Sequence, residues 1–340
     1  MREIMHLSFV TFALAAAACG IEALVGYPAA IFAAIGHPVT WMGRLIARLD
    51  AALNRDQDPP GLRRAAGFLA LACLLLATSL CVAGLVVLVS ALLGTGPVGV
   101  LVLALCTSAC LAQRSLAEHV GAVARALESE GLDAGRRAVG QIVGRDVAAL
   151  DEGAICRAAI ESLAENFSDG IIAPAFWIAM LGPFGGFLYK AVNTADSMIG
   201  HRTKRHAAFG FAAAKFDDLL NLVPARLAAL WICVAAFGSC RSTLRISNCR
   251  SAWRITWRDA RGHPSPNAGW PEAAMAGALG IRLGGPRSYQ SRVVEDAWIG
   301  EGRSALDAAD IRRALALYRR ACFINLAVLA AMALALIARG

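Results

Sequence analysis

Residues 66–93 read AGFLALACLLLATSLCVAGLVVLVSALL and contain no charged side chain. About 20 consecutive apolar residues are enough for a helix to cross the hydrocarbon core of a membrane. A second apolar run, 97–112, follows a short uncharged connection that contains Gly94 and Gly96. We therefore expect two membrane-spanning helices joined by a tight turn at this point in the chain.

Apolar runs recur along the rest of the chain, at about 8–25, 222–239 and 321–338. Another, at about 170–189, is interrupted by Gly182-Pro183 and Gly185-Gly186, which predicts a broken or re-entrant helix. The composition agrees, because 57% of residues are hydrophobic and 17% are charged, against about 25% charged in globular proteins. The expected fold class is an all-α polytopic membrane protein, with about five transmembrane helices plus the broken segment, in one domain over 1–340.

Arginine in the polar loops predicts the orientation of the chain. The loops 26–65, 113–166 and 241–320 are rich in arginine, whereas the connection at 94–97 carries no charge. Since Lys and Arg are enriched on the cytoplasmic side of membrane proteins, we expect these three loops in the cytoplasm and the protein in the cell inner membrane. The stretch 190–221 is also basic, and the sequence leaves its side open.

Several function classes find no support in the sequence. The formal charge is +8, but 33 Lys and Arg are interspersed with 25 acidic residues and form no long basic run, which argues against a nucleic-acid partner. The ten cysteines form no C-x-x-C pair, and most lie in apolar runs, so we expect reduced, buried thiols. No G-x-x-x-x-G-K-[ST] loop, Cys/His metal pattern or nucleophile elbow is present.

The first polar motif is Glu165-Asn166-Phe167-Ser168-Asp169-Gly170, which leads into an apolar run. Two carboxylates and an amide at the entrance of an apolar segment suggest a catalytic or binding role. The alternative is that Ser168 or Asp169 only caps a helix, with Pro174 in its first turn.

The second motif, 189–202, reads YKAVNTADSMIGHR. Helical spacing places Lys190, Asn193, Asp196 and Ser197 on one face. A cation, an amide, a carboxylate and a hydroxyl on one face suit the binding of phosphate and a divalent metal ion. The alternative is a polar helix face on which Lys190 pairs with Asp196 through its neighbours.

The third motif, 215–226, places Asp217 and Asn221 at i, i+4 and Lys215 and Asp218 at i, i+3. Adjacent carboxylates at the mouth of an apolar span are expensive to bury unless a cation is present. Mg²⁺ held by one or two carboxylates and nucleotide phosphates would supply that cation. The alternative is an interfacial charge cluster that anchors the helix.

The fourth motif is the loop 257–272, which is too aromatic for a flexible linker and too polar for a span. Its prolines stiffen it, and Pro271 can open a following helix. With His263, Asn267 and Trp270 it is typical of a substrate-contact loop, although it could also be a simple turn. A separate His37-Pro38 pair near the first span is open to a structural or a functional interpretation.

Together these stretches match E-N-x-x-D-G, Y-K-A-x-N-T-x-D-S-M-x-G-H-R, D-D-L-x-N-x-x-P-A-R and S-P-N-x-G-x-x-E-A-A. In these motifs the chain resembles the adenosylcobinamide-phosphate synthase family of cobalamin biosynthesis. The resemblance implies an integral membrane ligase that joins adenosylcobyric acid to (R)-1-amino-2-propanol O-phosphate, or to aminopropanol, through an amide. It also implies cleavage of ATP to ADP and phosphate.

The polar groups can be fitted to that reaction. We expect Mg²⁺ to be held by three aspartates, Asp196, Asp217 and Asp218. We expect the nucleotide and other phosphate groups to contact Lys190, Asn193, Arg202, Arg226 and Asn267. The acid–base candidates are Glu165, Asp169, His201 and His263, and the sequence does not choose among them.

Two other classes remain open at this stage. A membrane transporter of a small polar or corrinoid solute would use a similar broken helix, and a catalytically silent paralogue would keep the fold. The paralogue is expected to lose Asp196 and the Asp217-Asp218 pair, which are present. Beyond the lipid bilayer and the small-molecule substrates, association with other cobalamin-pathway enzymes is left open.

Overall fold

The computed structural model describes residues 2–144, 146–201, 203–237, 249–285, 287–289, 292–294 and 297–338. Helices dominate these residues and group into two compact units. Unit 1 comprises Met1–Ala112, Ala173–Asn221 and Leu326–Gly340, and unit 2 comprises Gln113–Ile172 and Leu222–Asn325. The predicted all-α fold class is confirmed, while the prediction of one domain over 1–340 stays a prediction.

Unit 1 is built around the long helix α9. Its helices are α1 (Arg2–Val25), α2 (Ala29–Ile35), α3 (Pro38–Leu53), α4 (Pro60–Leu93), α5 (Pro97–Ser108), α9 (Ala173–Ile199), α10 (Phe211–Leu220) and the end of α14 (Ala308–Ile337). α1 packs on α9 through small and branched residues such as Leu14, Ala18 and Ile178. Small side chains let two helix backbones approach closely, and the Thr11 hydroxyl donates to the Ala179 carbonyl at 2.8 Å.

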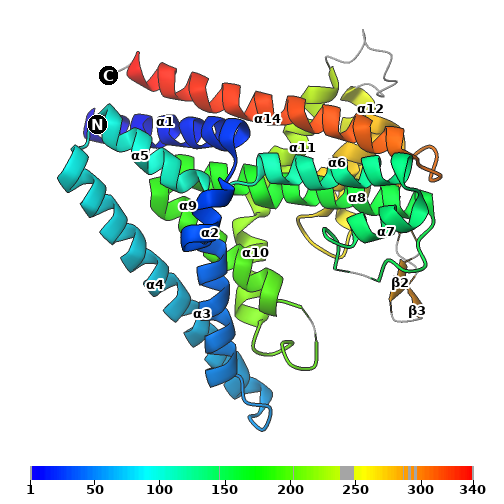
Figure 1. Cartoon of the computed structure of the whole chain (residues 1–340), viewed down its shortest axis with the longest axis horizontal. Coiled ribbons are helices and arrows are strands. Elements are labelled where there is room, and N and C mark those ends of the chain that lie inside the picture. The colour runs from blue at the N-terminus through cyan, green and yellow to red at the C-terminus, as the bar shows by residue number, and fades with distance from the viewer. Residues whose placement is uncertain are drawn as a thin grey trace. The chain divides into compact units, whose positions relative to one another are not determined.

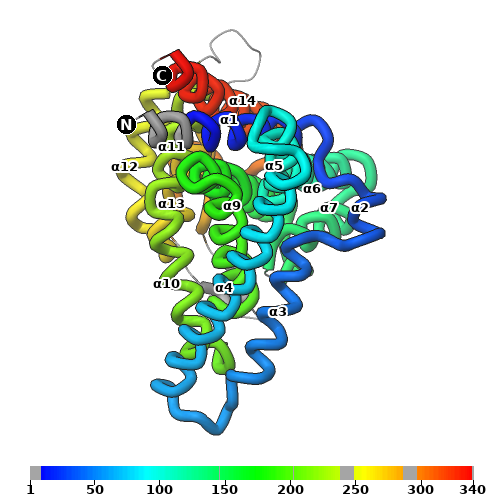
Figure 2. Tube along the Cα trace, turned by 90° about the vertical axis from the view of Figure 1, so that its left-hand side faces the viewer, coloured from blue at the N-terminus to red at the C-terminus, as the bar shows by residue number. Residues whose placement is uncertain are grey.

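The stretch 26–65, expected to be a polar loop, contains α2, α3 and the start of α4 instead. Figures 1 and 2 show α3 and α4 joined as a hairpin. α3 buries Met42 and Ile46, which lie four residues apart on one face. Its arginines Arg44 and Arg48 each follow a buried residue by two positions and so lie on other faces of the helix. This amphipathic pattern explains why the arginines suggested a loop.

His37 begins α3 as its N-cap, with Nδ1 accepting the backbone N–H of Val39 at 3.2 Å. The Thr40 side chain completes the capping box, and the His37 ring meets the Tyr27 ring edge-on, with centroids 4.3 Å apart. The structural interpretation of His37 is therefore supported.

The predicted break in α9 is present at Gly182, whose φ of 61° and ψ of −148° are not helical. Pro183, which has no N–H to donate, follows directly. A Cβ on Gly185 would lie 1.9 Å from the Trp177 carbonyl oxygen, so the chain can turn there only because this residue has no side chain.

Neither Ser168 nor Asp169 begins a new helix as its N-cap, and Ser168 is instead the C-cap position of α8, so the alternative of a cap before the apolar run is wrong. The chain continues from α8 (Glu152–Phe167) through the π-helical turn η1 (Ser168–Ile172) into α9. A π turn is wider than an α turn and is frequent at functional sites. Pro174 follows within the next turn, where the irregular backbone tolerates the missing donor.

Unit 2 packs its elements around one apolar core. They are α6 (Gln113–Ser129), α7 (Leu132–Val139), α8, η1, α11 (Leu222–Phe237), α12 (Cys249–Asp259), the 3₁₀ turn η2 (Ala260–Gly262), α13 (Gly269–Leu279), β1 (Arg282–Gly284), β2 (Arg287–Tyr289), β3 (Arg292–Val294), β4 (Trp298–Gly300) and the first part of α14. β1 pairs with β4 and β2 with β3, both antiparallel. The sequence did not predict these short strands.

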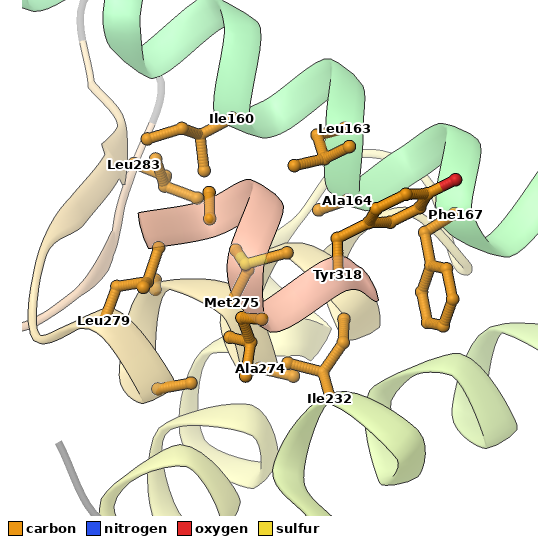
Figure 3. Close-up of a cluster of buried hydrophobic side chains, with 14 of the residues drawn as sticks. Ile160, Leu163, Ala164, Phe167, Ile232, Ala274, Met275, Leu279, Leu283 and Tyr318 are labelled. Atoms are coloured by element: carbon orange, nitrogen blue, oxygen red, sulfur yellow. The ribbon is translucent and has the colours of Figure 1, made fainter. Parts of the chain in front are cut away.

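The core of unit 2 joins α8, α11, α13 and α14 (Figure 3). Phe167 of α8 meets Tyr318 of α14 edge-on, with ring centroids 5.6 Å apart, and Met275 of α13 is fully buried beside them. The Tyr318 hydroxyl donates to the Gln113 carbonyl at 2.8 Å. A buried phenol needs such a partner, so this bond fixes one end of α6 on α14.

The chain is a multi-pass membrane protein. By length and composition, five described helices can cross a membrane: Ala29–Leu53, Pro60–Leu93, Pro97–Ser129, Glu152–Ile199 and Ala308–Ile337. The bent pair Phe211–Leu220 and Leu222–Phe237 is a sixth if counted as one span, and Phe9–Val25 is a shorter apolar helix. The predicted number of spans holds, but Ala29–Leu53 was not among those expected.

Gly67 and Gly84 offer a matched test of the packing of α4. A Cβ at position 67 would lie 2.0 Å from the Phe209 carbonyl oxygen, whereas nothing lies within 4 Å of one at position 84. We expect Gly67→Ala to lower the stability of the purified protein by about 1–3 kcal/mol through overpacking. Gly84→Ala should leave it unchanged or slightly raise it, because alanine is the better helix former. Thermal unfolding in detergent measures both, and equal midpoints would contradict the packing.

Candidate active site

The polar centre of unit 1 is the carboxylate of Asp217 on α10, which is only 8% exposed. Its Oδ2 accepts the Asn221 side-chain amide at 2.9 Å, and its Oδ1 accepts the Asn193 amide of α9 at 3.4 Å. The second and third motifs, separate in the sequence, therefore meet at one carboxylate. An i, i+4 pair supplies one bond and the packing of α9 on α10 supplies the other.

Both amides are oriented by a further donor. The buried Tyr189 hydroxyl donates to Asn221 Oδ1 at 2.9 Å, and Lys190 Nζ donates to Asn193 Oδ1 at 3.2 Å. Each amide nitrogen must then face Asp217, since its oxygen is already used as an acceptor. The result is two short series of hydrogen bonds, from Tyr189 through Asn221 and from Lys190 through Asn193, that both end at the Asp217 carboxylate.

The donor set around Asp217 fits a divalent cation. The Asp196 carboxylate is close enough for its charge to act on Asp217, and Asn193 links the ammonium group of Lys190 to Asp217. A buried carboxylate with carboxylates near it is stabilised by a cation. Mg²⁺ in nucleotide sites needs only one or two protein carboxylates, because phosphates and water complete its shell.

The described residues contain no group of three or more His, Cys, Asp and Glu side chains arranged to hold a metal ion. Asp218 is engaged elsewhere, since its Oδ2 accepts Lys215 Nζ at 2.8 Å. The Ser197 hydroxyl donates to the Asn193 carbonyl of its own helix at 2.9 Å. The charges of both Asp196 and Asp218 act on Asp217, and the pair with Lys215 makes Asp218 the weaker candidate for a metal ligand.

Unit 2 holds a second group of predicted residues, around Arg226 of α11. Its guanidinium donates to Asn267 Oδ1 at 3.1 Å and lies over the Trp270 ring, 4.6 Å from the centroid. Arg226 and Trp270 border a hollow of about 460 Å³, which His263 also lines. The predicted substrate-contact loop thus does more than turn the chain, because it forms a wall of this hollow with Arg226.

His263 is held by its own loop. Its Nδ1 accepts the Ser265 backbone N–H at 3.0 Å, and its Nε2 lies 3.7 Å from the buried Glu272 carboxylate. The neutral imidazole then carries its proton on Nε2. A base needs a free lone pair, so this geometry favours a positioning role for His263, and its catalytic role stays a prediction.

A group of ion pairs and hydrogen bonds next to this loop involves Asp259 and Glu301. Asp259 accepts Arg258 Nε at 2.5 Å and the Gly300 backbone N–H at 2.7 Å. Burial alone would raise the pKa of Asp259, but these hydrogen bonds hold it below its ordinary value. Arg254 and Arg258 both pair with Glu301, so α12 is tied to the segment around β4.

Comparison with known proteins agrees with the motifs. The chain matches the CobD/Cbib protein family over residues 15–318. It belongs to that family. The cobalamin biosynthesis protein CobD of Rhodobacter capsulatus is 47% identical over 310 residues, which cover 91% of this chain and 93% of the relative. Its counterpart in Sinorhizobium fredii is 45% identical over 317 residues, covering 93% and 95%. The one in Brucella suis is 45% identical over 299 residues, covering 88% and 89%.

No solved structure matches this chain. The family match and the relatives confirm the predicted family, and every site residue discussed above lies inside the matched range.

The remaining predicted residues of this family member have more open surroundings. Glu165 is exposed on α8, Asp169 is half-buried in η1 and His201 is exposed just after α9. Arg202 lies outside the described residues. The Ser168 hydroxyl, between the two carboxylates, is buried without a hydrogen-bond partner among the described residues.

Sequence reasoning did not name Tyr189 or Arg261 as site residues, and it noted Asn221 only for its i, i+4 distance to Asp217. Tyr189 gave no signal, because an aromatic residue next to an apolar run is usually a core residue. Arg261 lies in the quoted loop, and only the folded chain places it at the hollow beside Arg226.

The metal hypothesis predicts a change in thermal stability. A ligand that binds only the folded protein adds about 2.7 kcal/mol when present at a hundredfold excess over its Kd. We expect Mg²⁺ to raise the unfolding temperature of the wild type in detergent. Asp217→Asn should lose this rise. It also sets its own amide N–H groups against one of the two amide donors, so the measurement compares each variant with and without the ion rather than their absolute stabilities.

Asp218→Asn is the matched control, since it breaks a partly exposed pair with Lys215, worth about 0–1 kcal/mol. It should keep the rise caused by Mg²⁺. If Asp217→Asn keeps the rise and Asp218→Asn loses it, Asp217 does not hold the ion.

Proposed function

We propose that this protein forms an amide between adenosylcobyric acid and (R)-1-amino-2-propanol O-phosphate, or aminopropanol itself, with ATP as the energy source. The observation that carries the proposal is the buried Asp217 carboxylate, held by two oriented amides and flanked by Lys190 and Asp196. Such a group suits a Mg²⁺–phosphate complex. The relatives' names support the pathway, since they are cobalamin biosynthesis proteins.

The chemistry needs ATP because a carboxylate is a poor acyl donor. A carboxylate oxygen of the corrinoid attacks the γ-phosphorus of ATP, and ADP leaves with the electrons of the broken P–O bond. The amine nitrogen then attacks the acyl carbon, and inorganic phosphate leaves. One proton of the attacking amine passes to a base, so that amide, ADP and phosphate are the products.

The side chains of unit 1 would act on the phosphate end. Mg²⁺, when bound, would neutralise charge that develops on the transferring phosphoryl group. Asp217 and Asp196 would hold that ion, and Lys190 would place its ammonium group against a phosphate oxygen. Among the base candidates, Glu165 and His201 are exposed, whereas the Nδ1 of His263 is already an acceptor.

Product analysis tests this function. Purified protein is incubated with adenosylcobyric acid, Mg·ATP and each amine in turn, and the corrinoid product is identified by mass. An amide product that needs both ATP and Mg²⁺ supports the proposal. Movement of a solute into proteoliposomes without amide formation would establish the transporter alternative, and binding without turnover the silent paralogue.

Substitutions at Asp196 and Ser197 distinguish the effect of a lost charge on α9 from the effect of a lost neutral side-chain group. Asp196→Asn keeps the size of the side chain but removes its charge, so we expect turnover to fall about 10²–10³-fold in a folded protein. Ser197→Ala removes a hydroxyl that bonds only its own helix backbone, so we expect a loss of about tenfold or less. The rate of amide formation measures both. The reverse order, in folded proteins, would move the phosphate site away from this face.

We also propose that the arginines outside the candidate spans, such as Arg55 between α3 and α4, face the cytoplasm in the cell inner membrane. α4 joins the exposed turn that holds Arg55 to the exposed turn that holds Thr95, so a helix that crosses the membrane places them on opposite sides. In a background without native cysteines, Arg55→Cys should be protected from an impermeant maleimide in intact cells and Thr95→Cys labelled. Labelling of position 55 from outside would overturn the orientation.

A further inference from the structure

The hollow in unit 2 has an unusual lining for a membrane protein. Its polar lining side chains are Arg226, Arg261, His263 and Ser265, and its aromatic ones are Trp257 and Trp270. None of the described residues that line it carries a carboxylate. Two guanidinium groups and an imidazole therefore border a space of about 460 Å³, within the usual size of a small-molecule site, roughly 300–1,000 Å³.

The two arginines of the hollow lack acidic partners. No described carboxylate forms an ion pair with Arg226 or Arg261, although the other guanidinium groups around the loop, those of Arg254 and Arg258, pair with Glu301. Arg226 and Arg261 are also close enough for their charges to act on each other. Two like charges at one hollow repel each other, and an anion bound between them would offset that repulsion.

The lining is also preorganised. Arg226 is fixed by Asn267, by the Leu222 carbonyl at 2.8 Å and by the Trp270 ring. Both bonds use the same guanidinium nitrogen, so its other N–H groups have no acceptor among the described residues. A guanidinium held in this way can meet an oxyanion without losing further side-chain freedom.

Ser265 adds a hydroxyl donor to this lining. Its Oγ accepts the backbone N–H groups of Asn267 and Ala268, both at 3.2 Å. With its lone pairs used, the hydroxyl has a proton to give, and the described residues offer it no acceptor. Two cations and a fixed hydroxyl donor on one wall are complementary to a tetrahedral oxyanion.

We propose that this hollow binds the phosphate group of a small phosphorylated amine, which would be the amine substrate. The inference rests on the proposed function, because it names which of its ligands occupies the second site. A nucleoside triphosphate is carried with Mg²⁺ and needs carboxylates, which this lining lacks. A phosphate monoester is a metal-free dianion and matches the two guanidinium charges.

Arg261 is the residue to change, because it is exposed and no described side chain forms an ion pair with it, so we expect its loss to leave the fold intact. Arg250 gives the matched control. It is exposed on α12, carries the same charge and does not line the hollow. Equilibrium dialysis of detergent-purified full-length protein measures binding of (R)-1-amino-2-propanol O-phosphate, of free aminopropanol and of Mg·ATP, with inorganic phosphate as competitor.

We expect Arg261→Gln to weaken binding of the phosphorylated amine about tenfold or more, as for the loss of one charge-assisted hydrogen bond. Arg250→Gln should bind it like the wild type, and inorganic phosphate should compete. Binding of free aminopropanol and Mg·ATP should not distinguish the two variants. Equal binding of the phosphorylated amine by both variants, or a loss confined to Mg·ATP, would overturn the inference.

Turnover separates this inference from the proposed function. If amide forms and both variants have the same KM for the phosphorylated amine, the function stands and the inference fails. If no amide forms but only Arg261→Gln loses binding of the phosphorylated amine, the inference stands and the ligase function fails.

Discussion

The Asp217 carboxylate is the constraint on which the helices of unit 1 depend. A buried charge costs several kcal/mol unless hydrogen bonds or a counter-ion replace its water, and here two amides do so. One amide belongs to α9, so α9 and α10 must pack at the register that brings Asn193 to Asp217. The other is Asn221, which follows the last residue of α10. The end of a helix and the orientation of a carboxylate are thus set by the same residue.

The two groups of polar residues have opposite electrostatic character. Around Asp217, carboxylates and amide groups gather with one lysine, which suits a metal ion and the phosphates it carries. Around Arg226, arginines, a histidine and tryptophans line a hollow without a carboxylate, which suits an anion that binds without a metal. A reaction that joins a nucleotide-activated acid to a phosphorylated amine has one ligand of each kind. This correspondence supports the ligase proposal more strongly than either group alone.

Local sequence spacing predicted the contacts that lie within one helix. The bond between Lys190 and Asn193, the bond between Asp217 and Asn221, and the pair of Lys215 with Asp218 all follow from helical periodicity. Contacts between helices did not follow, since nothing in a single sequence pairs Asn193 with Asp217 or brings Arg261 to Arg226. The π turn at Ser168 was also missed, because a carboxylate or hydroxyl before an apolar run predicts a cap far more often than a wide turn. α3 was missed because its arginines share the helix with an apolar face.

The direction of the hydrogen bonds around Asp217 adds an argument that distances alone do not give. Lys190 donates to Asn193 and the Tyr189 hydroxyl donates to Asn221. Each of these amides in turn donates one N–H to Asp217. Both ends therefore present donors to Asp217, which must accept with both oxygens, a role that an ionised carboxylate fills without loss. Reversing either amide would set two donors or two acceptors against each other, which costs about 1–3 kcal/mol in a buried site. Tyr189 and Lys190 are adjacent in sequence but act through different amides, Asn221 and Asn193, to orient the two oxygens of the Asp217 carboxylate. A metal ion that carries a phosphate would need a carboxylate held in this way.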